Sequence, residues 1–195
     1  MEITVTYRPT RRLSIHITKE GEVRVSAPYG ISKRRIASFI ESHGEWIERN
    51  RKRILTAARG REEFYASLPQ TTPAERKQAA KELDAIVKPM IEHYSPLMGV
   101  YPERVRYRAN KSKWGSCNIA KREITFSTYL LLLPLNCIEH VVVHELAHLL
   151  VPNHGKEFHS AMDTYFPEWK KARQDTKRVS SGQLKREDMR SEDLP

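Results

Sequence analysis

Residues 134–150 constrain the fold most, because apolar side chains lie on nearly every side of the helix that they predict. This segment contains the pattern His-Glu-x-x-His, from His144 to His148. A helix that is apolar all round is buried in a protein core, and burying two imidazoles and a carboxylate costs free energy unless something binds them. The segment therefore predicts a central helix that carries a polar site, opened by a capping box of Asn136 and Glu139.

The spacing of the two histidines indicates a metal site. His144 and His148 are about one helical turn apart, so both imidazoles project from the same face and can share an ion. Glu145 is turned by about 100 degrees from His144, which lets its carboxylate reach a water on the ion without binding the ion itself. Imidazole ligands and water activation favour Zn²⁺. We therefore expect Glu145 to be the general base of a zinc-dependent hydrolase.

A catalytic zinc ion takes three protein ligands and leaves one position for water. We expect His154 to be the third ligand, because the helix can end near residues 151–153 and the next turn can bring this side chain back. Glu157, Asp163 and Glu168 remain alternatives, since some zinc enzymes take a carboxylate from the following helix.

Other polar residues near the motif have less specific interpretations. His140 and His159 can each be an ordinary core or surface histidine, or a hydrogen-bond partner of a ligand or substrate. An oxyanion donor is also expected, and His159 and Tyr165 are candidates for it. Cys117 is interpreted as a small buried hydrophobic residue rather than as a metal ligand.

The first third of the chain changes from one period to another. Residues 2–27 alternate between apolar and polar side chains, which predicts a small antiparallel meander. Residues 32–53 have the period of an amphipathic helix, whereas residues 56–71 lack it and are interpreted as a loop. Thr72 and Glu75 then form the capping box of a second helix.

The second half predicts another sheet and further helices. Residues 104–108 and 122–128 have the composition of strands, and residues 155–175 indicate a helical region that is broken at Pro167. Little can be buried after residue 177, which predicts a disordered tail. The sequence thus divides into an N-terminal strand meander plus helix at 1–70, a catalytic region at 71–176 and a tail at 177–195.

The charge balance favours acidic partners. The formal charge is +10, and basic residues crowd the first third of the chain. Nucleic acid is one such partner, and a solvated basic surface is the simpler alternative. The two cysteines fit a reducing compartment, no apolar run approaches the roughly 18 residues of a membrane span, and the N-terminus lacks the features of a secretory signal. We therefore expect a cytoplasmic protein without a membrane segment.

Several short segments occur in a specific order. They are RLSIHI and GEVRVSAP in the predicted strands, Trp46-Ile47 in the first helix, Trp114-Gly115-Ser116-Cys117, and HELAHLLVPNH followed by Lys156-Glu157-Phe158. With them the chain resembles the YgjP-like zinc metallopeptidase family, compact zincins related to SprT-type proteases, over nearly all residues up to about 175. The resemblance implies an α+β zincin-like domain with N-terminal antiparallel strands, a small mixed sheet and an active-site HExxH helix.

The same resemblance assigns zinc binding to three histidines and the role of base to one glutamate. These residues are His144, His148 and His154, and Glu145. The chain departs from the family's pattern at His159, where the family tends to have Trp, and at Ser127, where it tends to have Asn. Because zincin substrates pair with an edge strand beside the site helix, we expect residues 124–127 to be the substrate platform.

Together these features predict a zinc-dependent metallopeptidase that acts on peptides or proteins. Two other functions remain open. One is hydrolysis of a non-peptide amide or ester, because HExxH activates water without selecting the bond. The other is a nucleic-acid-associated zinc protein whose basic first third docks DNA or RNA. SprT-type relatives work on DNA-bound proteins, so a peptidase of this kind could also bind nucleic acid.

Overall fold

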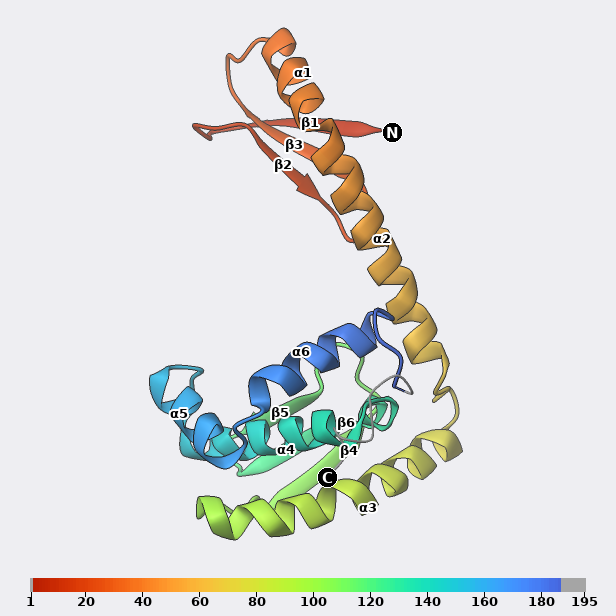
Figure 1. The fold of residues 1–195 in the computed structure, drawn as a ribbon, viewed down its shortest axis with the longest axis vertical. Coiled ribbons are helices and arrows are strands. Elements are labelled where there is room, and N and C mark those ends of the chain that lie inside the picture. Colours follow the sequence, from red (N-terminus) through yellow and green to blue (C-terminus); the bar gives the residue numbers. More distant parts are fainter. Residues whose placement is uncertain (1, 187–195) are drawn as a thin grey trace. The chain divides into compact units, whose positions relative to one another are not determined.

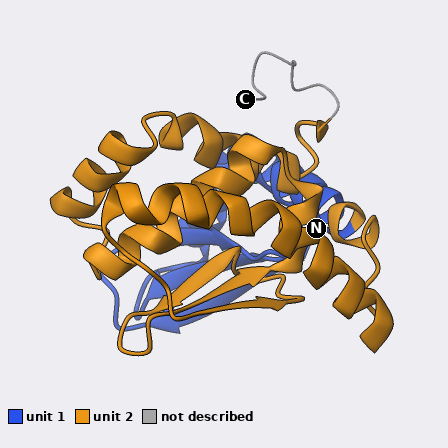
Figure 2. Cartoon of the chain, turned by 90° about the horizontal axis from the view of Figure 1, so that it is seen from below, with its two compact units in different colours: residues 1–62 blue, residues 63–195 orange. Residues whose placement is uncertain are grey.

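The structure, a computed structural model, describes residues 2–186 (Figure 1). The chain forms two compact units, residues 1–62 and 63–195, which Figure 2 colours separately. Their boundary lies within helix α2, Gly44–Ala66, earlier than the division at residue 70 that the sequence suggests. Both units combine helices with a three-stranded sheet, so the chain has the α+β character expected.

Helix α2 continues through residues for which the sequence predicts a loop. Residues 56–66 are rich in Ala, Arg and Glu, which have high intrinsic helix propensity. None of these residues is fully buried. A helix without a buried face needs no apolar stripe, so the hydrophobic periodicity from which helices are predicted is absent here. The predicted loop at 56–71 is therefore wrong as far as Ala66.

The sheet of the first unit has the strand order β1-β3-β2. Its strands are β1, Ile3–Arg8, β2, Ser14–Ile17, and β3, Val23–Pro28. Strand β2 pairs with β3 in antiparallel fashion, but β1 pairs with β3 in parallel. The predicted antiparallel meander is therefore wrong in one of its two pairings. Strand β3 takes the central position, and one of its faces, formed by Val23, Val25 and Ala27, is fully buried.

Two helices supply the apolar side chains that cover this sheet. Helix α1, Lys33–Ser42, begins after Ser32, whose side chain accepts a hydrogen bond from the backbone N–H of Arg35. Ile36 of α1 packs against Val25, and Ile47 of α2 packs against Val23 on the same face of the sheet. The first unit thus has a small core of its own.

The second unit contains the remaining elements. They are α3, Pro73–Met98, β4, Arg104–Arg108, β5, Gly115–Asn118, β6, Glu123–Ser127, η1, Thr128–Leu132, α4, Leu135–Leu150, α5, Lys156–Tyr165, and α6, Trp169–Ser180. The predicted capping box of Thr72 and Glu75 at the start of α3 is confirmed. Its sheet is mixed: β6 lies in the centre, parallel to β4 and antiparallel to β5. Strands β4 and β5 are therefore the edges.

Helix α4 lies in the middle of the second unit (Figure 1), in contact with α3, α5, α6 and β5. The helix forms as expected, but its predicted capping box is wrong: the N-cap is Pro134, which offers no side-chain hydrogen bond. Glu139 instead accepts a hydrogen bond of 2.7 Å from the hydroxyl of Tyr94 on α3. A tertiary partner has thus replaced the local one.

The C-terminal segment is ordered further than the sequence suggests. Helix α6 extends to Ser180, and Val179 is buried in the main core. The predicted disordered tail from residue 177 therefore starts too early, and residues 187–195 lie outside the described residues. Among the helices of residues 2–186, none combines the length and the apolar composition that crossing a membrane requires.

Candidate metal centre

Three histidines converge at the end of α4. His144 and His148 belong to this helix, and His154 follows in the turn before α5. One nitrogen from each imidazole lies within 4.8 Å of the other two, and Nε2 of His154 is 3.1 Å from Nε2 of His144. The ring centroids are 4.7 to 5.0 Å apart. Such a group can hold one metal ion with three nitrogen ligands.

The turn after α4 accounts for this convergence. Helix α4 stops at Leu150, and the extended backbone of Val151 begins the return of the chain. Nδ1 of His148 lies 3.3 Å from the carbonyl oxygen of Val151. If Nδ1 carries the proton and donates to this oxygen, Nε2 remains an acceptor and can bind a metal. The turn therefore delivers His154 and also orients His148.

The ring of Phe158 packs against all three imidazoles. Its centroid lies 4.9 Å from that of His144, 4.8 Å from that of His148 and 4.7 Å from that of His154. Phe158 is in the first turns of α5 and is almost wholly buried. The aromatic ring therefore restricts the orientation of every candidate ligand from one side, a role that the motif spacing does not indicate.

Burial favours the neutral form of the two imidazoles on α4. Burial is the main cause that lowers the pKa of His144 to about 3, and the neighbouring His148 lowers it further. Burial likewise lowers the pKa of His148. Neutral imidazoles are the form that binds metal, because a protonated ring has no lone pair to donate. Three imidazoles grouped in this way match the donor set of a catalytic zinc ion.

Glu145, which follows His144 on α4, has a buried side chain. Its side chain is 5% exposed, and within residues 2–186 its Oε2 atom has no partner. Burial raises the pKa of this carboxyl to about 8, against a smaller opposing effect of Lys113. Burying a carboxyl group without a hydrogen-bond partner costs free energy. This cost indicates that Glu145 interacts with a bound ion, water or substrate.

Gly115 at the start of β5 leaves the space that Glu145 occupies. A Cβ atom at position 115 would lie 2.6 Å from Cγ and 2.7 Å from Cδ of Glu145. A side chain at position 115 would displace the Glu145 carboxyl, so the glycine is explained by close packing rather than by backbone freedom. Gly115 lies between the predicted strands at 104–108 and 122–128, so the sequence predicts no strand at β5. The glycine in the segment Trp114-Gly115-Ser116-Cys117 is the sequence signal that could have identified this contact.

Trp114 and Cys117 complete the segment whose role the sequence alone does not explain. Trp114 packs edge-on against Phe64 at 6.1 Å and lies near Tyr65 at 6.3 Å, both at the end of α2. The Trp114 carbonyl accepts a hydrogen bond of 2.8 Å from the backbone N–H of Ser127. Cys117 is half-buried, and burial together with the charge of Glu145 raises its pKa to about 11. The segment therefore anchors the edge strand beside Glu145.

The carboxylates considered as alternative ligands do not join the three histidines. In the described part of the chain, the group that could hold a metal consists of histidines alone. Asp163 instead accepts a hydrogen bond of 2.7 Å from the Trp169 indole. His159 stacks on the same indole, with centroids 5.3 Å apart and an interplanar angle of 7°. This stacking accounts for His159 without a catalytic role.

His140 contacts His144 but does not belong to the group of three candidate ligands. Its ring centroid is 5.9 Å from that of His144, and within the described residues neither of its nitrogens has a hydrogen-bond partner. Burial lowers its pKa to about 4. The ring also lies 6.4 Å from that of Phe166. His140 therefore packs between His144 and Phe166. Tyr165 is half-buried against the main core.

Comparison with known families now bears on this geometry. The sequence profile described as YgjP-like, metallopeptidase domain matches residues 11–73 and 67–179. The chain belongs to the YgjP-like family. The resemblance drawn from the sequence is thereby confirmed, and the match includes the residues of the histidine group.

Other comparisons add little to the family assignment. One solved structure with similarity is described as the crystal structure of the metallopeptidase zymogen of Pyrococcus abyssi abylysin. It is 24% identical, covers 51% of this chain and 97% of its own, and superposes with a TM-score of 0.43. No curated protein matches the sequence.

Proposed function

We propose that this YgjP-like protein is a zinc-dependent peptidase that uses Glu145 as its general base. His144, His148 and His154 would hold the ion. The observation that carries the proposal is the convergence of three imidazoles next to a buried carboxyl whose Oε2 atom has no hydrogen-bond partner among residues 2–186. Each of these features is costly by itself, and together they suit a divalent cation with a water beside it.

When bound, a zinc ion would supply an acidified water and an electrophile for the scissile carbonyl. Glu145 would accept a proton from the nucleophilic water and later deliver it to the leaving amine. The raised pKa of this carboxyl belongs to the protein without an ion, and a cation nearby would favour the charged form. The burial of Glu145 would also keep the proton from exchanging freely with bulk water.

The substrate platform that the sequence suggests at residues 124–127 needs correction. These residues form β6, the central strand, whose two edges already pair with β4 and β5. Strand β5 is the edge strand that contacts α4. The hydrogen bond between Ser127 and the Trp114 carbonyl sets the alternation in this antiparallel pair. By that alternation Gly115 and Cys117 point their N–H and C=O groups away from β6, where an extended peptide could pair with them.

The test combines metal analysis with hydrolysis assays on purified protein. We expect the wild-type protein to contain about one zinc ion per chain and His148→Ala to lose it. Glu145→Gln should retain the zinc while its hydrolysis of a denatured protein falls by about 100-fold or more. A Glu145→Gln variant with full zinc and full activity would show that the base is misassigned. A panel of peptides, small amides and esters separates peptidase activity from hydrolysis of other bonds.

A further inference from the structure

The first unit has a groove that the proposed peptidase activity does not use. It lies between the turn that follows β3 and the helix α1, and its volume is about 670 Å³. Arg11, Arg12 and Arg35 line it, and no carboxylate does. The first 62 residues contain fourteen Lys and Arg against seven Asp and Glu, so the groove lies in the more basic part of the chain.

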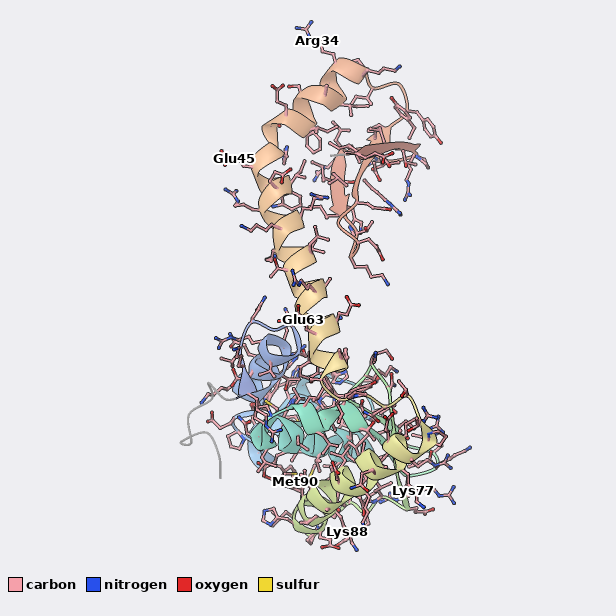
Figure 3. All side chains as sticks on the ribbon, turned by 90° about the vertical axis from the view of Figure 1, so that its right-hand side faces the viewer. Arg34, Glu45, Glu63, Lys77, Lys88 and Met90 are labelled. Atoms are coloured by element: carbon pink, nitrogen blue, oxygen red, sulfur yellow. The ribbon has the colours of Figure 1, made fainter. Side chains whose placement is uncertain are left out.

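The three arginines of this groove are exposed and have no ion pair among residues 2–186. In the part of the chain that the structure describes, no carboxylate lies within salt-bridge distance of Arg11, Arg12 or Arg35. Arg34, which follows Lys33 in the first turn of α1, is also exposed and extends away from the helix (Figure 3). Like charges at the positive end of a helix are unfavourable, so an anionic partner would relieve a repulsion that already exists.

A second groove of the same unit provides a contrast. It is lined by Arg8, Arg24 and Arg51, but also by Glu2, Glu20 and Glu22. Arg24 and Glu22 form an ion pair of 2.7 Å, and Nε of Arg51 donates to the backbone oxygen of Gly21. Positive charge in that groove is largely compensated within the protein. The groove beside α1 therefore carries the stronger field for an anion.

An aromatic side chain lies among the unpaired arginines. Tyr29 follows β3, lines the groove and is 69% exposed. Phe39, on α1, lines the same groove and is half-buried. An exposed ring next to guanidinium groups offers a flat apolar face on which a nucleobase can stack, while the arginines reach the flanking phosphates. An acidic peptide would have no use for such a ring, and a duplex keeps its base faces stacked and out of reach.

We propose that this groove binds single-stranded nucleic acid, with Arg11, Arg12 and Arg35 contacting phosphates and Tyr29 stacking on a base. The site lies wholly within the first unit and involves none of the candidate metal ligands. A test of nucleic-acid binding at this groove is therefore independent of the proposed peptidase activity.

The test measures binding of the full-length protein to fluorescently labelled DNA and RNA single strands of about 20 nucleotides, which exceeds the usual site size. Fluorescence anisotropy is recorded at several salt concentrations. We expect Arg11→Gln/Arg12→Gln/Arg35→Gln to reduce the slope of log affinity against log salt by about 2, because each lost phosphate contact contributes about 0.7. Comparing the DNA and RNA arms shows which nucleic acid is preferred.

A charge-matched variant controls for the loss of net charge. Lys19→Gln/Arg24→Gln/Arg49→Gln removes the same three charges from the same unit, but each side chain is already paired with a glutamate. The pairs are Lys19 with Glu20 at 3.8 Å, Arg24 with Glu22 at 2.7 Å and Arg49 with Glu45 at 3.4 Å. We expect the control to change the salt slope much less. Equal losses in both triple variants would overturn the assignment of the groove.

Tyr29 provides a second readout that charge alone does not affect. Tyr29→Ala should weaken binding by roughly 5- to 150-fold at an unchanged salt slope, as expected for the loss of one stacked base. Tyr29→Phe should restore it. If Tyr29→Ala binds single strands normally, or if polyglutamate or duplex DNA binds as tightly as the single strand, the stacking assignment is wrong. Circular dichroism of each variant establishes that it is folded.

Discussion

Gly115 and Glu145 lie in direct contact, with the carboxyl group of the glutamate filling the space that a side chain at position 115 would need. The contact joins the edge strand β5 to the helix that carries the candidate ligands. It explains why a glycine stands at the start of this strand. It also means that the position of Glu145 depends on a residue thirty positions earlier in the chain.

Gly115→Ala should therefore displace the Glu145 carboxyl without removing any candidate ligand. We expect hydrolysis of a denatured protein to fall by about 100-fold, as small misplacements of a catalytic group do, while the zinc content stays at the wild-type level. Gly44→Ala is the matched control, because a Cβ atom there has no neighbour within 4 Å. Normal activity in Gly115→Ala would show that the carboxyl can move without consequence.

His154 and His159 are close in sequence but differ in surroundings, which allows a paired test. Removing a metal ligand should cost more than the roughly 10- to 100-fold that supporting residues contribute. We expect His154→Ala to weaken zinc binding by more than about 100-fold. His159→Ala should leave zinc affinity nearly unchanged, because its ring stacks on Trp169. Competition with a chromophoric chelator measures both, and equal losses would contradict the ligand assignment.

Phe158 should influence the metal centre through packing alone. Phe158→Leu retains an apolar side chain but removes the flat ring that contacts three imidazoles. We expect zinc affinity to fall by about 10- to 100-fold. Phe166→Leu changes an aromatic residue that is also buried but whose ring contacts His140, and it should have a smaller effect. If both variants bind zinc equally well, the ring of Phe158 does not orient the candidate ligands.

The thiol of Cys117 reports on the charge of Glu145. Its pKa of about 11 is raised by burial and then by that carboxylate, so the reactive thiolate forms only as the pH increases toward 11. In a Cys137→Ser background, alkylation of Cys117 by iodoacetamide should be slow at pH 9 and accelerate with each further increase in pH. Glu145→Gln should lower this pKa and speed the reaction at pH 9. Mass spectrometry measures the rates, and an unchanged rate would place the two groups further apart.

Trp114 should stabilise both the second unit and its edge strand. Trp114→Ala removes the contacts with Phe64 and Tyr65, and a half-buried Trp should cost about 2–3 kcal/mol of unfolding free energy, less than a fully buried one. Urea unfolding measures this loss. Hydrolysis should decrease as well, because β5 loses an anchor, whereas Trp114→Phe should retain most of both. An unaffected unfolding free energy would show that the aromatic cluster is incidental.

The sequence predicts best where local chemistry decides the structure. The capping box of Thr72 and Glu75 forms as expected, because its partners are three residues apart. At Glu139 the same kind of local prediction fails, because the Tyr94 hydroxyl competes from another helix. The order of the strands in each sheet could not be predicted either, because alternation of apolar and polar residues predicts a strand but not its neighbours.

The candidate site shows the same division between local and tertiary information. Helical spacing places His144 and His148 on one face, so the sequence alone indicates that pair. Whether a turn returns His154 to them depends on the path of Val151 and the packing of Phe158, which spacing does not reveal. The choice of β5 over β6 as the free edge required the observed strand order.

The contact of Phe158 with all three imidazoles links assembly of the metal centre to completion of the fold. A chain emerging from the ribosome presents His144 and His148 before His154 and α5 have been made. Two imidazoles on one helix bind an ion weakly and leave it open to exchange. If the three imidazoles hold the ion as proposed, full coordination would come only after α5 has docked, and a nascent chain would not hydrolyse peptides before it is folded.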